Sequence, residues 1–363
     1  MAGDIRRILI VKMSSIGDLL HALPAVRCLK AGLNAQIDWM VHPVYAELAG
    51  CFSDVSRVLV FPRRGPPVEF LRQIRSLRAG QYDLIIDLQG ILKSAIVSRL
   101  GHAPVRIGPS FHREGASFFY TAVAGVKNKN RHAVDENMDF IRHLGLPLLP
   151  PVYPLTVPLQ LVSESSPRVA FLPFSRWPSK NWPPMSFARV GRELQENYGA
   201  SIYLMGSPGD QALCAEIEQV LNGSVINLAG KTTLPQMAGL LREMDLVIAN
   251  DSGPMHLAAV LGAQVLAMYG PSDPVRTGPP PGTRCRILRG KLMCQPCFSR
   301  RCRFGDGSCM LTITPESVIQ AALEMLAKHP VKQSGKKYLS DNKTINLQQK
   351  KGMEEKFTLN SNQ

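Results

Sequence analysis

The chain has 363 residues, 45% of them hydrophobic, and a formal net charge of +14 at pH 7. One small domain is excluded, because this length supports two globular domains that each bury a core. No run of about eighteen apolar residues is present to span a membrane, and no signal-peptide core follows Met1. We therefore expect a cytoplasmic protein whose partner is anionic: nucleic acid, a membrane surface or a phosphorylated substrate.

Short apolar runs alternate with helical patterns in the first half of the chain. Near-continuous apolar strands separated by helices are typical of a parallel sheet covered on both faces. We expect strands at residues 8–11, 37–41, 58–61, 84–88 and 105–107, and helices at 19–30, 68–79, 92–100 and 133–144.

The same alternation restarts after a proline-rich stretch at residues 144–159, LGLPLLPPVYPLTVPL. Its prolines remove backbone donors and fix φ, so we place a domain boundary there, with domains over residues 1–155 and 156–330. Residues 331–363 are polar and lysine-rich, and we expect this tail to be disordered. The second half predicts strands at 169–172, 201–205, 225–227, 246–249 and 265–269, and helices at 185–198, 211–221, 234–243, 255–261 and 315–328.

The loop after the first strand, in ILIVKMSSIGDLLHALPAV, has one glycine and a carboxylate, Asp18. The dinucleotide-binding fingerprint G-x-G-x-x-G is therefore absent. A lone carboxylate here would repel a diphosphate. Two interpretations remain open: Asp18 caps the helix that follows, or it is a general base that takes a proton from a hydroxyl.

Basic residues are concentrated between Arg57 and Arg131. This segment has thirteen Lys or Arg against four Asp or Glu, a net charge of +9. Any single one of these residues fits a solvated helix face. The bias over the whole segment indicates that the first half of the chain meets an anionic ligand.

The loop after the strand at 246–249 reads NDSGPMH. Asp251 or Ser252 can cap a helix that we expect to begin at Pro254. The free amides of such a helix start form a site for phosphate after Gly253, and His256 can donate to the same anion. The alternative is an ordinary helix cap with a surface histidine.

Two further loops in the second half carry polar residues just past a strand. Ser175, Arg176 and Lys180 lie in FLPFSRWPSKNWPP, where a cation on a stiff loop suits a diphosphate. The alternative is a rigid surface loop in which the tryptophan packs. Asp210, in MGSPGDQAL, either caps the next helix or holds a ribose hydroxyl.

Four of the eight cysteines are spaced C-x2-C-x4-C-x6-C within sixteen residues: Cys294, Cys297, Cys302 and Cys309. In a cytoplasmic chain such a cluster indicates either a structural metal site, for which zinc is the best match, or free thiols. The spacing departs from paired C-x2-C knuckles. No Asp-x-Asp pair occurs anywhere in the chain to hold a divalent ion against a diphosphate.

Several motifs together resemble the ADP-heptose:lipopolysaccharide heptosyltransferases of Gram-negative bacteria. The matching stretches are VKMSSIGDLLHALPAV, YDLIIDLQGILKSA, SRWPSKNWP, GSPGD, NDSGPMHLAA and YGPSDPVRTGP, in family order over roughly residues 7–325. The SSIGD loop is most similar to the enzymes that add the first heptose to the Kdo sugar. The resemblance implies a GT-B fold, in which two doubly wound, Rossmann-like α/β domains face each other across a cleft. It also implies inverting transfer without a catalytic cofactor or metal.

The resemblance assigns roles to individual residues, with Asp18 as the base that deprotonates the acceptor. It implies ADP-heptose binding by the C-terminal domain at Lys180, Asp251, Ser252, Gly253 and His256, to which we add Ser175, Arg176 and Asp210 from the loops described above. It implies binding of the anionic acceptor, Kdo-lipid A or core, by the N-terminal domain, where we expect contacts at Ser14, Ser15, His21, Arg63, Arg64, Gln89 and Lys93. The enzyme would then work at the cytoplasmic face of the inner membrane, with no nucleic-acid partner.

Two departures keep other readings open. Ser175-Arg176-Trp177 replaces a threonine-rich loop of the first-heptose members, and the cysteine cluster resembles a stretch in second-heptose and other members. The alternatives are a later core heptosyltransferase, a nucleotide-sugar epimerase of the same fold, or a zinc-containing nucleic-acid-binding protein. A nucleic-acid-binding protein would fit the net positive charge and the clustered cysteines, but no helix-turn-helix or ββα pattern surrounds the cysteines.

Overall fold

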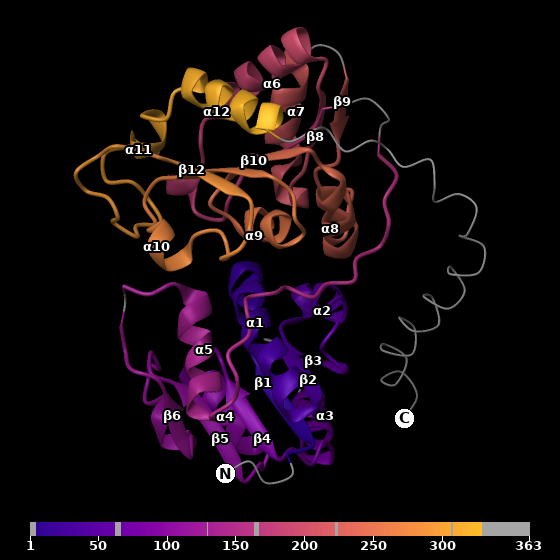
Figure 1. The fold of residues 1–363 in the computed structure, drawn as a ribbon, viewed down its shortest axis with the longest axis vertical. Helices are drawn as coiled ribbons and strands as arrows, with labels where there is room; N and C mark the ends of the chain where they lie inside the picture. Colours follow the sequence, from indigo (N-terminus) through magenta and orange to yellow (C-terminus); the bar gives the residue numbers. More distant parts are fainter. Residues whose placement is uncertain are drawn as a thin grey trace.

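The computed structural model describes residues 5–61, 67–128, 130–162, 167–221, 224–305 and 308–328. These residues form two α/β halves that lie one above the other in Figure 1, each built on a six-stranded parallel sheet. The tail at residues 331–363, together with Arg63 and Arg64, lies outside the described residues.

The N-terminal sheet has the strand order β3-β2-β1-β4-β5-β6. Chain order therefore reverses between β1 and β4, which is the switch point of a doubly wound sheet. Its strands are β1 (Arg7–Val11), β2 (Gln36–Val41), β3 (Arg57–Val60), β4 (Leu84–Asp87), β5 (Val105–Pro109) and β6 (Ala122–Ala124). Its helices are α1 (Ile16–Leu33), η1 (Pro43–Tyr45), α2 (Ala46–Gly50), α3 (Pro67–Ala79), α4 (Leu92–Leu100), η2 (Ala116–Phe119) and α5 (Ala133–His143).

The C-terminal sheet repeats this topology with the order β12-β11-β10-β7-β8-β9, so its switch point lies between β7 and β10. Its strands are β7 (Arg168–Leu172), β8 (Ser201–Leu204), β9 (Val225–Asn227), β10 (Leu246–Asn250), β11 (Val265–Tyr269) and β12 (Cys285–Arg289). Its helices are η3 (Pro178–Lys180), α6 (Pro184–Tyr198), η4 (Pro208–Asp210), α7 (Gln211–Val220), α8 (Leu234–Glu243), α9 (Gly253–Val260), α10 (Pro274–Thr277), α11 (Ser308–Leu311) and α12 (Pro315–Lys328).

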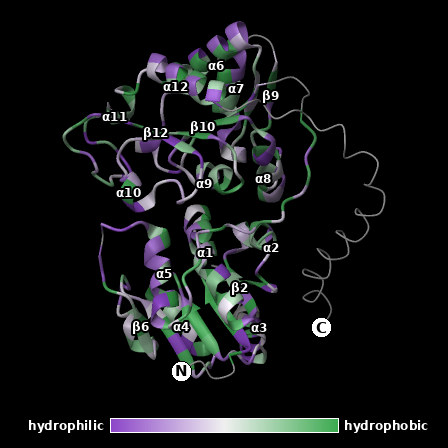
Figure 2. Cartoon of the chain, viewed as in Figure 1, coloured by the Kyte–Doolittle hydropathy of each residue, from purple (hydrophilic) through white to green (hydrophobic). Residues whose placement is uncertain are grey.

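The central strands are apolar because helices cover both of their faces. Every residue of β4, β7 and β10 is buried, and in Figure 2 the central strands of the N-terminal sheet are mostly green whereas α5 shows purple segments. Burial also requires that polar groups are paired. Arg168, at the start of β7, donates from its side chain and its backbone to Asp245, just before β10, at 3.1 and 2.8 Å.

The structure corrects several boundaries predicted from the sequence. Helix α1 begins at Ile16, three residues before the predicted start, because Ser15 provides the N-cap. Helix α9 begins at Gly253, ahead of the proline. The edge strands β6 and β12 were not predicted, since neither is a continuous buried apolar run: the three residues of β6 are mostly exposed or half-buried, and none of the five in β12 is buried.

The two halves are packed together at their facing helices. One buried hydrophobic cluster includes Ile16 and Leu20 of α1 together with Met255 of α9, and Figure 1 shows these two helices meeting at the boundary. A hydrogen bond also joins the two halves: the Arg176 guanidinium of the C-terminal half donates to the Tyr45 hydroxyl of the N-terminal half at 3.3 Å. None of the described helices is both long and apolar enough to cross a membrane.

Candidate active site

Asp18 lies in the first turn of α1, directly after the carboxyl end of β1. It completes a capping box with Ser15, whose backbone N–H and hydroxyl both donate to Asp18 Oδ2 at 2.8 Å. One of the two predicted roles of Asp18, the helix cap, is therefore present. Because both bonds end on Oδ2 and no described residue donates to Oδ1, the cap leaves the second oxygen available.

The surroundings of Asp18 keep its carboxylate ionised. Burial works to raise the pKa, but the positive charge of Lys12 and the two Ser15 hydrogen bonds outweigh it, so the pKa of Asp18 is lowered. Lys12 is itself buried at the end of β1, where its ammonium donates to the Leu88 carbonyl at 2.6 Å. The Asp18 carboxylate and the Lys12 ammonium thus influence each other electrostatically near the switch point of the N-terminal sheet.

The loop after β4 supports the loop that leads to Asp18. Gln89 Oε1 accepts from the backbone N–H groups of Met13 and Ser14, at 3.2 and 3.4 Å. Asp87 in turn fixes the Gln89 backbone by accepting from its N–H at 2.8 Å. The structure thus brings Ser14, Ser15, Asp18 and Gln89 together, as the parallel ends of β1 and β4 require.

In the C-terminal half, the equivalent switch point holds Lys180 and Asp251. The Lys180 ammonium lies 2.5 Å from Asp251 Oδ2 and 4.6 Å from the centroid of the Trp177 ring. Ser272 donates its hydroxyl to the same carboxylate oxygen. Strands β7 and β10 are adjacent in the sheet, so Lys180, which follows β7, lies beside Asp251, which follows β10. The buried Asp251 carboxylate thereby holds the Lys180 ammonium in place.

The start of α9 has free polar groups. Ser252 is the N-cap residue, yet its side chain makes no capping hydrogen bond, and among the described residues its buried Oγ has no partner. The first amides of α9 and this hydroxyl therefore remain available to an anion, which the helix dipole favours. This arrangement fits the phosphate site predicted for Ser252 and Gly253.

The two helix starts touch each other across the boundary. A Cβ added to Gly17 would lie 2.9 Å from His256 Cδ2, and one added to Gly253 would lie 2.8 Å from Ile16 Cβ. Only glycine permits this approach at either position. The close packing fixes the distance between the starts of α1 and α9, and so between Asp18 and the polar groups at the start of α9.

Three histidines form a stack at this boundary. The His21 ring lies 4.7 Å from the His256 ring and 5.1 Å from the His132 ring, both edge to face. Burial lowers the pKa of His256 to about 3 and lowers the pKa of His21 well below its usual range. All three histidines have lowered pKa values, so they are neutral near pH 7.

The other residues predicted to bind donor or acceptor do not all lie beside Asp18 or Lys180. His21 is buried in the stack, and Lys93 is exposed, with its ammonium 5.3 Å from the Phe61 ring. Asp210 accepts from Ser207 at 2.7 and 2.8 Å, which closes a capping box at η4, whereas its side chain makes no capping hydrogen bond to α7, the helix it was expected to cap. The Ser175 hydroxyl accepts from the Trp177 N–H at 3.2 Å, which stabilises the loop before Lys180.

The four clustered cysteines line a separate cavity in the C-terminal half. Their thiols influence one another, since burial and the neighbouring thiols of Cys302, Cys297 and Cys294 raise the pKa of Cys309. In the described part of the chain, however, no three histidine, cysteine or acidic side chains are grouped so as to hold a metal ion.

Sequence reasoning missed three residues of this site: Lys12, His132 and Ser272. Lys12 directly follows a buried strand, a position where a charged residue is uncommon, and this was a usable signal. His132 accepts from the Val134 N–H as the N-cap of α5, and its other ring nitrogen lies 3.2 Å from the Gly278 carbonyl of the other half. No local pattern indicates that contact, because it depends on how the halves pack.

Two doubly wound domains with polar residues at facing switch points define an α/β enzyme of the kind that binds nucleotide ligands. The model of glycosyltransferase family 9 (heptosyltransferase) matches residues 70–307, more than half of the chain. The chain therefore belongs to glycosyltransferase family 9, the heptosyltransferases.

Relatives and solved structures agree with this assignment. The lipopolysaccharide heptosyltransferase 1 of Salmonella typhimurium is 32% identical over 289 residues, which are 74% of this chain and 89% of the relative. The structure of E. coli ADP-heptose LPS heptosyltransferase II matches with a TM-score of 0.75 at 27% identity, covering 89% of this chain and 99% of that one. E. coli heptosyltransferase WaaC with ADP-2-deoxy-2-fluoro heptose matches with a TM-score of 0.71 at 27% identity, covering 88% and 99%. These structures confirm the expected GT-B architecture.

Proposed function

We propose that this glycosyltransferase moves a heptose from ADP-heptose to the Kdo sugar of the lipopolysaccharide inner core, with inversion and without a catalytic metal. The observation that carries the proposal is the position of Asp18, an ionised carboxylate in the first turn of α1, whose Gly17 lies against His256 of the other domain. The ADP-heptose analogue bound by WaaC and the names of the relatives support the donor and the acceptor class.

In the proposed step, the acceptor hydroxyl oxygen attacks the anomeric carbon of the heptose as the bond from that carbon to the ADP oxygen breaks. The hydroxyl proton passes to Asp18 Oδ1, and the electron pair of the broken bond leaves with ADP. Because the acceptor enters opposite the leaving group, configuration inverts. A carboxylate of lowered pKa is a weak base, so proton transfer follows the rise in acidity of the hydroxyl as the new bond forms.

The charge that develops on ADP is stabilised by the C-terminal domain. The groups that do so are the Lys180 ammonium, the free amides at the start of α9 and the unpartnered Ser252 hydroxyl. Asp251 holds Lys180 in place through its Oδ2 rather than facing the diphosphate, which it would repel. These groups replace the divalent ion that an Asp-x-Asp pair would bring.

An anionic membrane surface is the proposed location of the acceptor. The N-terminal domain has a basic-apolar band over α3, α4 and η2, in which α4 contacts the other two elements. Its exposed apolar members are Val68, Leu71, Leu92, Ile96 and Phe118, and its exposed basic members are Arg72, Arg75, Arg78, Lys93, Arg99 and Arg113. Exposed apolar residues among cations suit a bilayer with acidic lipids. The band adjoins the Asp18 loop, because the Arg113 N–H donates to the Gly90 carbonyl beside Gln89.

The deciding experiment is a transfer assay with ADP-heptose and either Kdo-lipid A or its monoheptosylated product, without added divalent cation. We expect transfer to Kdo-lipid A alone, at a rate that Mg²⁺ does not change. Transfer to the heptosylated acceptor alone would assign the second-heptose reaction instead. Absence of transfer to both acceptors would refute the proposal.

A further inference from the structure

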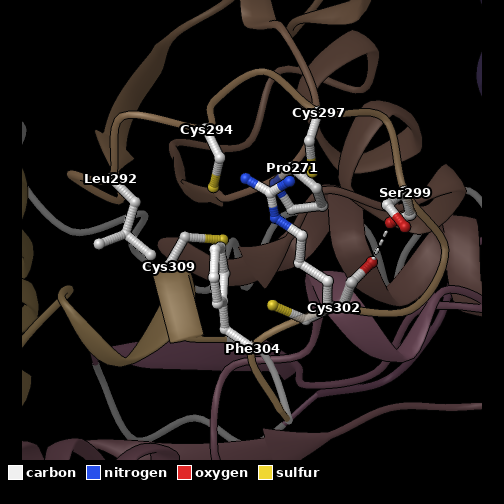
Figure 3. A pocket seen from close by; sticks show the side chains of 10 residues that line it. Pro271, Leu292, Cys294, Cys297, Ser299, Cys302, Phe304 and Cys309 are labelled. Carbon is white, nitrogen blue, oxygen red and sulfur yellow. Dashed lines mark hydrogen bonds between the residues drawn. The ribbon is translucent and has the colours of Figure 1, made fainter.

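A cavity lies in the C-terminal domain, next to the loop that carries Lys180. Its volume is about 370 Å³, and its lining includes Ser179 and four cysteines. Cys294, Cys297 and Cys302 come from residues 291–305, and Cys309 comes from α11. Figure 3 shows the four side chains around one hollow, and all four are free thiols.

We propose that this thiol cavity binds one soft divalent metal ion, with zinc as the best match. Four thiolates form the closed tetrahedral shell of structural zinc sites. Such a shell suits residues 291–305, which contain no helix or strand to hold them in place. Since no three potential ligands among the described residues are grouped around one point, the thiols must move inward when the ion binds.

The cavity opens to solvent, since Cys297 in its lining is exposed, so a metal ion can reach the four thiols. A zinc ion with four thiolates carries a net charge of −2, which needs a counter-charge. Arg303 is among the lining residues and can supply it.

The loop that forms the thiol cavity also braces the proposed donor site. Ser179 donates its hydroxyl to the Ser299 carbonyl at 2.6 Å, one residue from Lys180. The Arg300 guanidinium lies 5.5 Å from the centroid of the Trp177 ring, and the Lys180 ammonium lies over the same ring.

The same loop holds the segment before Ser272. Gln295 donates to the Gly270 carbonyl at 2.6 Å, and the Phe298 N–H donates to the Pro271 carbonyl at 2.8 Å. Ser272, the next residue, donates to Asp251. The bound ion therefore fixes both segments that position the Lys180–Asp251 pair.

The test is a metal titration of the full-length, reduced, metal-free protein. We expect one equivalent of Co²⁺ to bind with thiolate-to-metal charge-transfer absorption, and one equivalent of Zn²⁺ to displace it. Cys302→Ser and the double variant Cys294→Ser/Cys297→Ser should weaken binding at least 100-fold, while Cys285→Ser, outside the cavity, should not. Circular dichroism checks that each variant is folded. Absence of stoichiometric binding, a cobalt spectrum without thiolate absorption, or equal affinities in all variants would overturn the site.

The link to the donor site rests on the proposed function and has its own readout, the affinity for ADP measured by calorimetry. We expect ADP to bind about tenfold more weakly to the metal-free protein. Equal ADP affinity with and without zinc would overturn the link. Failure of ADP to bind either form would instead refute the proposed donor, and the cobalt spectrum would not be affected by it.

Discussion

Gly17 of the N-terminal domain lies against His256 of the C-terminal domain, and a Cβ on Gly17 would come within 2.9 Å of the histidine ring. That ring is buried and packed edge to face against His21, so moving it would break these contacts. The contact sets how closely the starts of α1 and α9 approach, and therefore how far apart Asp18 and the proposed phosphate site lie.

The first prediction concerns this contact. Gly17→Ala should push the two helix starts apart and lower kcat about tenfold, because a small displacement of reacting groups costs much of the rate. Gly209→Ala is the matched control, since an added Cβ there meets only the Ser207 hydroxyl, at 3.7 Å. Steady-state kinetics of both variants test this prediction. Equal kcat values for Gly17→Ala and Gly209→Ala would show that the contact between Gly17 and His256 does not control the reaction.

The second prediction concerns the base. Asp18→Asn keeps the shape of the side chain and should reduce kcat between about 10²- and 10⁴-fold, while ADP affinity stays within twofold. Thermal unfolding serves as the control for the lost cap. A variant that turns over at the wild-type rate would exclude Asp18 as the base.

Ser15→Ala provides a finer test of the same carboxylate. It removes the hydroxyl that donates to Asp18 Oδ2 and leaves the backbone donor in place. Because that bond helps to lower the pKa of Asp18, its loss should raise this pKa. The acidic limb of the kcat/KM profile should then move to higher pH, and an unmoved limb would contradict the assignment.

The third prediction separates charge from stability at the donor site. Lys180→Met leaves the buried Asp251 carboxylate with no cationic partner, only uncharged ones such as the Ser272 and Tyr269 hydroxyls, and should lower the free energy of unfolding by about 3 kcal/mol. Lys180→Met/Asp251→Asn should recover most of that stability but not the affinity for ADP. Denaturant unfolding and calorimetry measure the two effects, and recovery of ADP binding in the double variant would show that Lys180 does not contact the diphosphate.

The fourth prediction follows from the histidine stack. A histidine whose pKa is lowered on folding stabilises the fold above its unfolded value, about 6.5, and that stabilisation is lost as pH falls toward the folded value. With the pKa of His256 lowered to about 3, this residue should contribute a drop of about 2 kcal/mol in the free energy of unfolding between pH 7 and pH 5, and the lowered pKa values of His21 and His132 act in the same direction. In denaturant unfolding measured at both pH values, His256→Gln should reduce the dependence by about that amount, whereas substitution of the exposed His102 should leave it unchanged.

The fifth prediction addresses the basic-apolar band. Arg72→Glu/Arg75→Glu should reduce binding to vesicles containing acidic lipid at least tenfold, since each basic residue near the surface contributes about 1 kcal/mol. Phe118→Ser should also reduce this binding at least tenfold, because it removes an exposed apolar side chain that would enter the membrane. Turnover of a water-soluble acceptor should not change. Arg192→Glu/Arg289→Glu, on exposed residues of the other domain, is the matched charge control. Equal vesicle binding by both double variants would rule out the band as the docking surface.

Most of the fold follows from sequence pattern, because burial on both faces forces central strands to be apolar and regularly interrupted by helices. The predicted positions for β9 and β11, and for α4, α8 and α12, coincide with those observed. Edge strands β6 and β12, which lack a continuous buried apolar run, were not predicted. Edge strand β9 was predicted although none of its three residues is buried, so edge position alone does not decide whether a strand is recognised.

The sequence by itself determined the doubly wound halves, the motif order, and the candidates Asp18 and Lys180, each just past a strand. Only the tertiary structure decided what surrounds them. Parallel pairing brings Gln89 to the Asp18 loop and Asp251 to Lys180 across about seventy residues of chain. Packing of the two domains brings His256 to His21. The physical reason is that strand order and domain contact are set by the whole buried surface, which no local stretch encodes.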